Sequence, residues 1–191
     1  QLYTFLTSLV PPEKMREVAL YGAQVVKITG TYDRCKEIAQ QFALQRSLPC
    51  DRGLRNVAAI EAMKTIAYET AEQLALALPG GSNGGRLATP WRAPDWYVQS
   101  VSGGLGPVGV TKGFRELKQM GLIDRAPKVA CIQADGCAPM ANAFRRGLPQ
   151  AEPIANPRTR IHTLATGNPG RGYTIVKRLV DECGGVIDSV S

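Results

Sequence analysis

Short apolar runs and longer segments of helical periodicity alternate along the chain. Apolar runs at 2–6 and 25–29 predict two strands, the second because it is rich in β-branched residues. The segments 11–21 and 32–43 predict helices, since prolines suit a first helical turn and apolar positions recur at helical spacing. The first quarter of the chain therefore has the order strand, helix, strand, helix.

The same alternation continues after a turn-rich break at 46–56. A long helix is predicted at 57–78, followed by a loop rich in Gly and Pro at 79–95. Further strands are predicted at 96–101, 128–134 and 185–188, and further helices at 107–120, 138–146 and 170–183. Strands that alternate with helices form parallel sheets covered by helices.

We therefore predict an α/β fold with parallel sheets flanked by helices and arranged in two lobes. Residues 1–47 are expected to form part of a small lobe, and residues 48–191 a larger lobe that is incomplete at its C-terminus. Met140 and Phe144 fall at helical spacing, which is typical of core positions.

Composition narrows the function classes. Apolar residues make up 44% and charged residues 20%, as in ordinary globular proteins, and no apolar run approaches the roughly 20 residues that cross a bilayer. The net charge is +7, but the basic residues are scattered and only 6% of residues are aromatic, unlike a nucleic-acid interface. We expect neither a membrane nor a nucleic-acid partner. A basic surface suits an anionic small substrate.

The cysteines do not form a metal-binding pattern. Five cysteines contain no CxxC pair, and His162 is the single histidine, so no zinc constellation can be assembled. We expect free thiols in a reducing compartment, Cys137 being buried at a helix start, and a cytoplasmic location.

Four glycines within residues 103–109 stand between a predicted strand and a predicted helix. Backbone N–H groups at a helix start are unpaired and lie at the positive end of the helix dipole. Glycine lets a phosphate approach these donors, because no side chain intervenes. The loop therefore predicts an anion site.

Three interpretations of this loop compete. Gly104, Gly106 and Gly109 match the G-x-G-x-x-G dinucleotide fingerprint, for which Asp135 would be the acidic partner at the end of the next strand. A second interpretation is a tight structural turn without a ligand. The third rests on resemblance.

Blocks of sequence along nearly the whole chain resemble threonine synthases. They keep the order and spacing of that family, which makes them more specific than a glycine motif alone. The blocks are YGAQVV (21–26), GTYD (30–33), NVAAIEAMKTIAYETAEQ (56–73), APDWYVQ (93–99), SGGLGP (102–107), GLIDRAP (121–127), IQADGCAP (132–139), ATGNP (165–169) and ECGGVID (182–188).

This resemblance implies a fold type II enzyme that depends on pyridoxal 5'-phosphate. The family's glycine-rich loop, which holds the cofactor phosphate through backbone N–H groups, corresponds to Ser102, Gly103, Gly104, Leu105 and Gly106. The implied reaction is the conversion of O-phosphohomoserine and water to threonine and phosphate. The implied partners are a phosphorylated amino-acid substrate and, from the family alone, a second copy in a homodimer. Asn168 is expected to cap or turn the chain near the site.

The family's catalysis needs a lysine that forms a Schiff base with the cofactor, and no residue here matches it. Lys64 matches a Lys-Thr pair on the long helix, and we expect it to pair with Glu61 at i, i+3. Where the family commonly has Gly-Gln before that pair, this chain has Ala62-Met63. We expect the chain to be an interior fragment that is inactive alone, with no catalytic residue of its own to name. The alternatives are a cysteate-synthase-like β-replacement enzyme acting on O-phosphoserine and a non-catalytic truncated copy.

Overall fold

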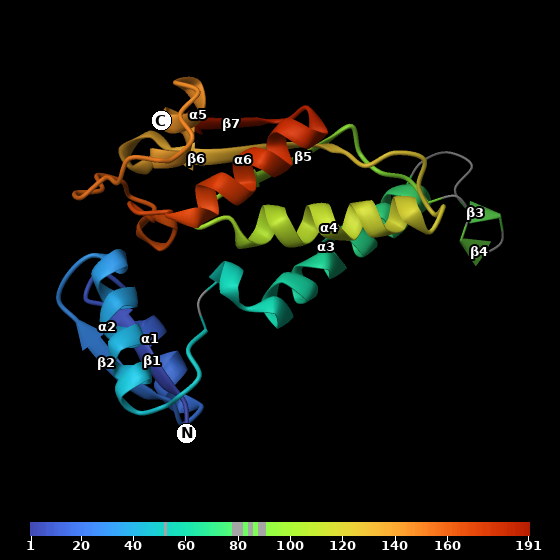
Figure 1. The fold of residues 1–191 in the computed structure, drawn as a ribbon. Helices are drawn as coiled ribbons and strands as arrows, with labels where there is room; N and C mark the ends of the chain where they lie inside the picture. The colour runs from blue at the N-terminus through green and yellow to red at the C-terminus, as the bar shows by residue number, and fades with distance from the viewer. Residues whose placement is uncertain (52, 78–81, 84–85, 88–90) are drawn as a thin grey trace.

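A computed structural model describes residues 1–51, 53–77, 82–83, 86–87 and 91–191. Two parallel sheets organise these residues (Figure 1). One sheet has the order β1-β2, and the other has the order β5-β6-β7. The expected α/β class with parallel sheets flanked by helices is confirmed. The boundary between lobes near residue 47 stays a prediction.

The first sheet belongs to a small unit at the N-terminus, drawn in blue in Figure 1. Its elements are β1 (Tyr3–Thr7), α1 (Pro12–Leu20), β2 (Gln24–Ile28) and α2 (Tyr32–Gln45). The strands pair in parallel, with Tyr3 opposite Gln24. The Phe42 ring of α2 packs over β1, at 5.0 Å from the ring centroid of Tyr3 and 5.2 Å from that of Phe5. We call residues 3–45 the small unit.

A pair of long helices follows and runs side by side through the middle of the molecule (Figure 1). A 3-10 turn, η1 (Gly53–Arg55), precedes α3 (Val57–Ala77), and α4 is formed by Leu105–Gln119. The buried residues of α3 are Ala67, Ala71 and Ala75, which recur every four residues and form one narrow face. A face of small residues lets a second helix approach closely, and α4 occupies it.

The second sheet consists of β5 (Trp96–Ser100), β6 (Lys128–Ala134) and β7 (Val186–Val190), all parallel. The helices α5 (Pro139–Arg145) and α6 (Arg171–Cys183) both contact β6 and β7, while α4 contacts β6 and α6. Two more 3-10 turns, η2 (Asp135–Cys137) and η3 (His162–Leu164), complete this part. We call residues 96–190 the large unit.

The main core lies between this sheet and its helices. Tyr173 and Val176 of α6, Met140 of α5 and Val129 of β6 are completely buried there. Phe144 packs against the same cluster, and Cys137 is buried just before α5. The sequence predictions for Met140, Phe144 and Cys137 are therefore confirmed.

Several boundaries differ by a few residues from the sequence predictions, and two differences have a clear physical reason. The helix α4 starts at Leu105 rather than at 107, because Pro107 needs no amide partner and fits inside the first turn. The predicted loop 79–95 contains two short antiparallel strands, β3 (Ser82–Asn83) and β4 (Arg86–Leu87). Strands of two residues carry no periodic signal that a sequence could reveal.

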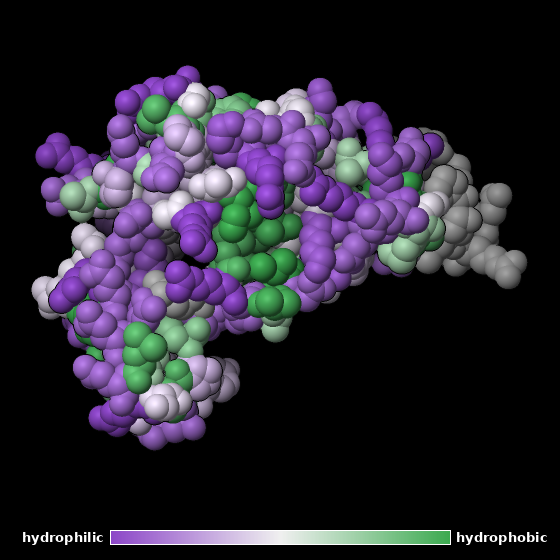
Figure 2. Space-filling view, in the orientation of Figure 1, coloured by the Kyte–Doolittle hydropathy of each residue, from purple (hydrophilic) through white to green (hydrophobic). Residues whose placement is uncertain are grey.

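Apolar and polar residues are unevenly distributed over the surface. The face in Figure 2 has an apolar area over the region where the first turns of α4 lie above α3 in Figure 1, and polar residues surround it. The exposed large apolar residues of α3 include Val57, Ile66 and Leu76. No helix within the described residues is long and apolar enough to cross a membrane.

Candidate functional site

The glycine-rich loop follows β5 at the carboxyl end of the parallel sheet, the usual place for ligands in α/β folds. The amide of Val101 donates to the carbonyl of Ile132 at 2.8 Å and is the last pairing of this strand with β6. Ser102 and Gly103 then turn the chain, and Gly104 is the N-cap of α4, with φ of 97°. This left-handed conformation is one that glycine adopts at little cost.

The amides of this loop are available to a ligand. Within the described part of the chain, the N–H groups of Ser102, Gly103, Gly104, Leu105 and Gly106 donate no hydrogen bond. The first turn of α4 reads Leu-Gly-Pro-Val, so its positive dipole end faces no acidic side chain of its own. Five free donors at the start of a 15-residue helix form a cradle that suits a phosphate.

Close packing explains why glycines line this cradle. A Cβ on Gly104 would lie 2.6 Å from a methyl group of Val176, and one on Gly106 would overlap the Gln99 side chain. A Cβ on Gly172, in the first turn of α6, would lie 2.5 Å from the carbonyl oxygen of Gly103. The loop is therefore pressed against α6 and β5, and its backbone has little freedom to move.

A pair of hydroxyl groups closes one side of the cradle. Ser102 Oγ lies 2.6 Å from Thr166 Oγ1, although 64 residues separate them in the sequence. Thr166 is buried, with only 2% of its surface exposed, whereas Ser102 is partly exposed. Sequence reasoning missed Thr166. It lies inside the ATGNP block, but nothing in the spacing relates it to Ser102.

The loop that carries Thr166 also connects the cradle to the small unit. The amide of Asn168 donates to Asp33 Oδ2 of α2 at 3.0 Å, across 135 residues of sequence. Asn168 Oδ1 accepts from the amide of Gly170 at 3.2 Å, so the expected turn-forming role of Asn168 is confirmed. On the other side, the carbonyl of Gly167 accepts from the amide of Ile154 at 2.9 Å.

The helix behind the cradle is held by contacts between backbones. A Cβ on Gly109 would lie 2.5 Å from the carbonyl oxygen of Ile60, and one on Gly113 would lie 2.8 Å from the Cβ of Ala67. The third glycine of the G-x-G-x-x-G pattern thus serves the contact between α4 and α3. In a dinucleotide fingerprint it would serve packing of the helix on its strand.

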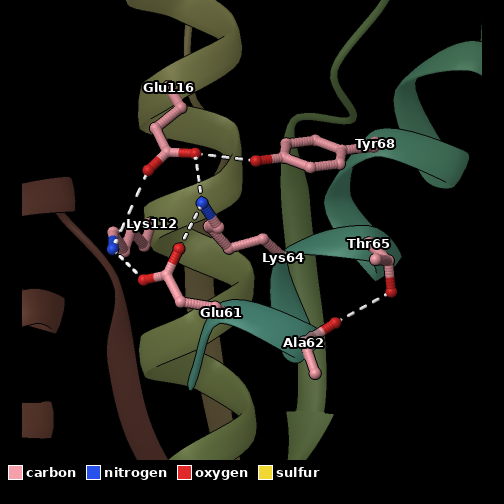
Figure 3. A network of polar contacts seen from close by, with 7 residues as sticks. All are labelled: Glu61, Ala62, Lys64, Thr65, Tyr68, Lys112 and Glu116. Atoms are coloured by element: carbon pink, nitrogen blue, oxygen red, sulfur yellow. Dashed lines mark hydrogen bonds and ion pairs between the residues drawn. The ribbon is translucent and has the colours of Figure 1, made fainter. Parts of the chain in front are cut away.

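Lys64 lies between α3 and α4 in a network of charged groups (Figure 3). Its Nζ is 2.5 Å from Glu61 Oε2 and 2.8 Å from Glu116 Oε2, the same oxygen that accepts from the Tyr68 hydroxyl at 2.7 Å. Lys112 pairs with Glu61 from the facing helix. The hydrogen bonds to Glu116 and then to Glu61 raise the pKa of Lys64.

A lysine that acts as a nucleophile or as a general base requires a lowered pKa. The ion pairs of Lys64 with two carboxylates act in the opposite direction and do not favour such a role. The prediction that it pairs with Glu61 is confirmed. Glu116 is an additional partner that the sequence did not indicate, because it comes from another helix.

Three of the five cysteines, Cys35, Cys131 and Cys137, have the properties of structural residues. All five cysteines are free, and burial raises the pKa of the Cys131 thiol to about 12. Burial also raises the pKa of Cys137 and of Cys35. Buried, protonated thiols are poor nucleophiles and poor metal ligands. Among the described residues, no cluster of three or more His, Cys, Asp or Glu could hold a metal ion.

Comparison with known families shows the family to which the chain belongs. The model of a family described as "Pyridoxal-phosphate dependent enzyme" matches residues 1–190. The chain belongs to this family. Membership of this family contradicts the dinucleotide interpretation of Gly104, Gly106 and Gly109, whereas binding of the cofactor phosphate at residues 102–106 stays a prediction.

Among curated proteins, this pyridoxal-phosphate dependent chain is similar to threonine synthases. It is 30% identical over 156 residues to the threonine synthase of Methanocaldococcus jannaschii, which covers 82% of this chain and 35% of the relative. It is 29% identical over 178 residues to that of Methanosarcina acetivorans, covering 93% of this chain and 40% of the relative. The chain thus spans less than half the length of these relatives.

Solved structures of the family share the fold. Maize serine racemase matches with a TM-score of 0.67 and 16% identity, over 98% of this chain and 48% of that one. A threonine deaminase from Solanum lycopersicum matches with a TM-score of 0.65 and 19% identity, over 98% of this chain and 47% of that one. The fold is that of the fold type II enzymes, whose cofactor is pyridoxal 5'-phosphate.

The residues present fit a cofactor that carries a phosphate. The cradle offers donors without a competing acceptor, and the glycines leave its backbone accessible. The comparisons establish the cofactor of the family, and the geometry of residues 102–106 is compatible with it.

Proposed function

We propose that this chain provides the cofactor-phosphate site of a threonine synthase, which converts O-phosphohomoserine and water to threonine and phosphate. The observation that carries the proposal is the cradle of free amides at residues 102–106, in a chain whose curated relatives are threonine synthases. The net charge of +7 supports a substrate that carries a phosphate.

In this proposal, the residues of the chain bind the cofactor through its phosphate and orient it. The amides of Ser102 to Gly106 hold the cofactor phosphate, and the positive end of the α4 dipole favours its negative charge. The contacts of α4 with α3 and α6 fix the direction in which those amides point. When bound, pyridoxal phosphate delocalises the negative charge that develops on the substrate during catalysis.

We further propose that none of the lysines of this chain bonds the cofactor covalently, so that the 191 residues alone are inactive. The pairing of Lys64 with two carboxylates supports this for the lysine that best matches a family motif.

We also propose a homodimer in the cytoplasm. The free thiols support a reducing compartment, and the exposed apolar residues of α3 support a second copy as partner.

The test measures products from the purified full-length protein loaded with pyridoxal phosphate. With O-phosphohomoserine, we expect release of phosphate and an equal amount of threonine. In a parallel reaction, O-phosphoserine with sulfite should give no cysteate. Formation of cysteate without threonine would replace the proposal with the β-replacement alternative, and release of neither product would favour a non-catalytic copy.

A variant of Gly104 tests whether the cofactor binds at the cradle. Gly104→Ala combines an unfavourable positive φ with an overlap against Val176, so we expect it to lose the cofactor. Gly121→Ala is the matched control, since Gly121 also has a positive φ, of 73°, lies beyond the C-terminal end of α4, and would present a Cβ that meets nothing within 4 Å. If Gly104→Ala folds and retains the cofactor as tightly as wild type, the phosphate site lies elsewhere.

A further inference from the structure

The two hydroxyl groups at the edge of the cradle, those of Ser102 and Thr166, differ in their exposure to solvent. Thr166 is 2% exposed, and within the described residues its hydroxyl has Ser102 as its one partner. Ser102 is partly exposed and lies at the first position of the loop. One hydrogen lies between the two oxygens, and the other must point elsewhere.

The environment decides which hydroxyl donates. If Ser102 donated to Thr166, the Thr166 hydrogen would be buried without an acceptor, which is unfavourable. If Thr166 donates to Ser102, the buried Thr166 hydroxyl is satisfied. The Ser102 hydrogen then remains free on the partly exposed side, next to the five loop amides.

We propose that Thr166 is a positioning residue that makes the Ser102 hydroxyl a donor to the cofactor phosphate. The inference rests on the proposed function of residues 102–106. It adds a sixth donor, and it assigns to a residue of the 165–170 loop the task of orienting it. A phosphate dianion has only acceptors, so an arrangement made entirely of donors is complementary to it.

The 165–170 loop is suited to this task because it is held from several sides. The Thr166 amide donates to the carbonyl of Leu164 at 2.8 Å, and the next residue accepts from Ile154. The Asn168 amide is held by Asp33. These contacts fix Thr166 before any ligand arrives, and preorganised donors bind without the loss of further conformational freedom.

The test compares the affinity of the full-length protein, freed of cofactor, for pyridoxal phosphate and for pyridoxal, which lacks the phosphate. Thr166→Val keeps the shape of the side chain but cannot donate. We expect it to weaken binding of pyridoxal phosphate about 10- to 150-fold, the effect of one hydrogen bond to a charged group, and to change pyridoxal binding less than twofold. Thr166→Ser restores the donor and should stay within about threefold of wild type.

A double variant separates orientation from direct contact. Ser102→Ala should weaken binding of pyridoxal phosphate as Thr166→Val does, and the combination should be no weaker than Ser102→Ala alone, because Thr166 acts through Ser102. The ³¹P resonance of the bound cofactor should shift in Thr166→Val and return in Thr166→Ser. If Thr166→Val does not fold, Thr166→Ala serves in its place.

Three results would overturn the inference. These are unchanged affinity of Thr166→Val for pyridoxal phosphate, an equal loss for pyridoxal, and additive losses in the double variant. In each of them the wild-type protein still binds pyridoxal phosphate, so the proposed function would survive. If wild type itself does not distinguish pyridoxal phosphate from pyridoxal, the cradle assignment fails, and the inference fails with it.

Discussion

The two parallel sheets are built alike but differ in what covers them. In the small unit, β1 and β2 pair over five residues, yet every residue of α1 is at least partly exposed and α2 buries only Cys35 and Ala43. In the large unit, β5 and β6 also pair over five residues, and α6 buries five residues against the sheet and its neighbours. Parallel pairing of strands does not by itself form a hydrophobic core. A core forms where amphipathic helices cover the sheet.

The difference has a consequence for the site. The small unit contributes few buried side chains of its own, and Asp33 connects it by a hydrogen bond to the loop that carries Thr166. The large unit supplies the rigid part, with the cradle held by β5 and α6. Regions with few buried contacts open more readily than cores. We therefore expect the small unit to exchange its amide hydrogens faster than the large unit.

The largest expected effect comes from removing the same aromatic ring in each unit. Phe114 is completely buried between α4 and α3, so Phe114→Ala should lower the free energy of unfolding by about 3–5 kcal/mol. Phe42→Ala in α2, where the ring is only partly buried, should cost less. Urea denaturation of both variants measures this, and equal losses would contradict the contrast between the units.

Next comes the contact between α3 and α4. In an exposed helix, Gly→Ala is favourable by about 1 kcal/mol, but a methyl group on Gly113 would meet Ala67 and the backbone of Lys64. We expect Gly113→Ala to destabilise the protein by about 1–3 kcal/mol. The control is Lys118→Ala, an exposed position of the same helix, with a change within about 0.5 kcal/mol. A stabilised Gly113→Ala would show that the helices can separate freely.

A smaller effect tests the connection between the units. Asp33→Ala removes the acceptor of the Asn168 amide, and one hydrogen bond of this kind contributes about 1 kcal/mol. We expect hydrogen exchange at Asn168 to accelerate severalfold. Glu37→Ala removes an exposed ion pair with Arg34 on the same helix and should leave Asn168 unchanged. Equal protection in wild type and Asp33→Ala would mean that the loop is held without the small unit.

The smallest effect is the pH dependence of the Lys64 network. Hydrogen bonds from Lys64 and then from Tyr68 lower the pKa of Glu116 below its usual 4.5, and those from Lys112 and then from Lys64 lower that of Glu61. These carboxylates therefore stabilise the folded state above pH 4.5, and the contribution disappears as the pH falls through their lowered pKa values. The raised pKa of Lys64 means that its contribution is complete below 10.5 and is lost as the pH rises further.

The predicted direction of the pH dependence is tested by measuring the melting temperatures of Glu116→Gln and of wild type across a range of pH. The difference between the two proteins should be largest between about pH 5 and 10 and should shrink in acid. A difference that grows below pH 4 would show that the network does not act through charge. Lys118→Gln, which removes an exposed charge from the same helix, is the control.

Features formed by residues close together in the sequence could be predicted, whereas contacts between residues far apart in the sequence could not. Helical and strand periods of 3.6 and 2 predicted the elements, and the glycines of residues 103–109 indicated the candidate anion site, because both signals are local. The pairing of Lys64 with Glu61 was local as well. Glu116 beside Lys64, Thr166 beside Ser102 and Asp33 beside Asn168 were missed, since they lie 52, 64 and 135 residues apart and meet only after folding.

The glycines of α4 also determine when the site can exist. Gly106, Gly109 and Gly113 each disfavour an isolated helix by about 1 kcal/mol relative to alanine, so α4 on its own is a poor helix. It becomes stable only once α3 fills the space that the glycines leave open. We therefore expect the cradle to form only once these two helices have packed together, so that a newly synthesised chain would bind the proposed phosphate ligand only after that step. On the proposed function, cofactor binding would report completed folding, because the cofactor would bind the native form in preference to its precursors.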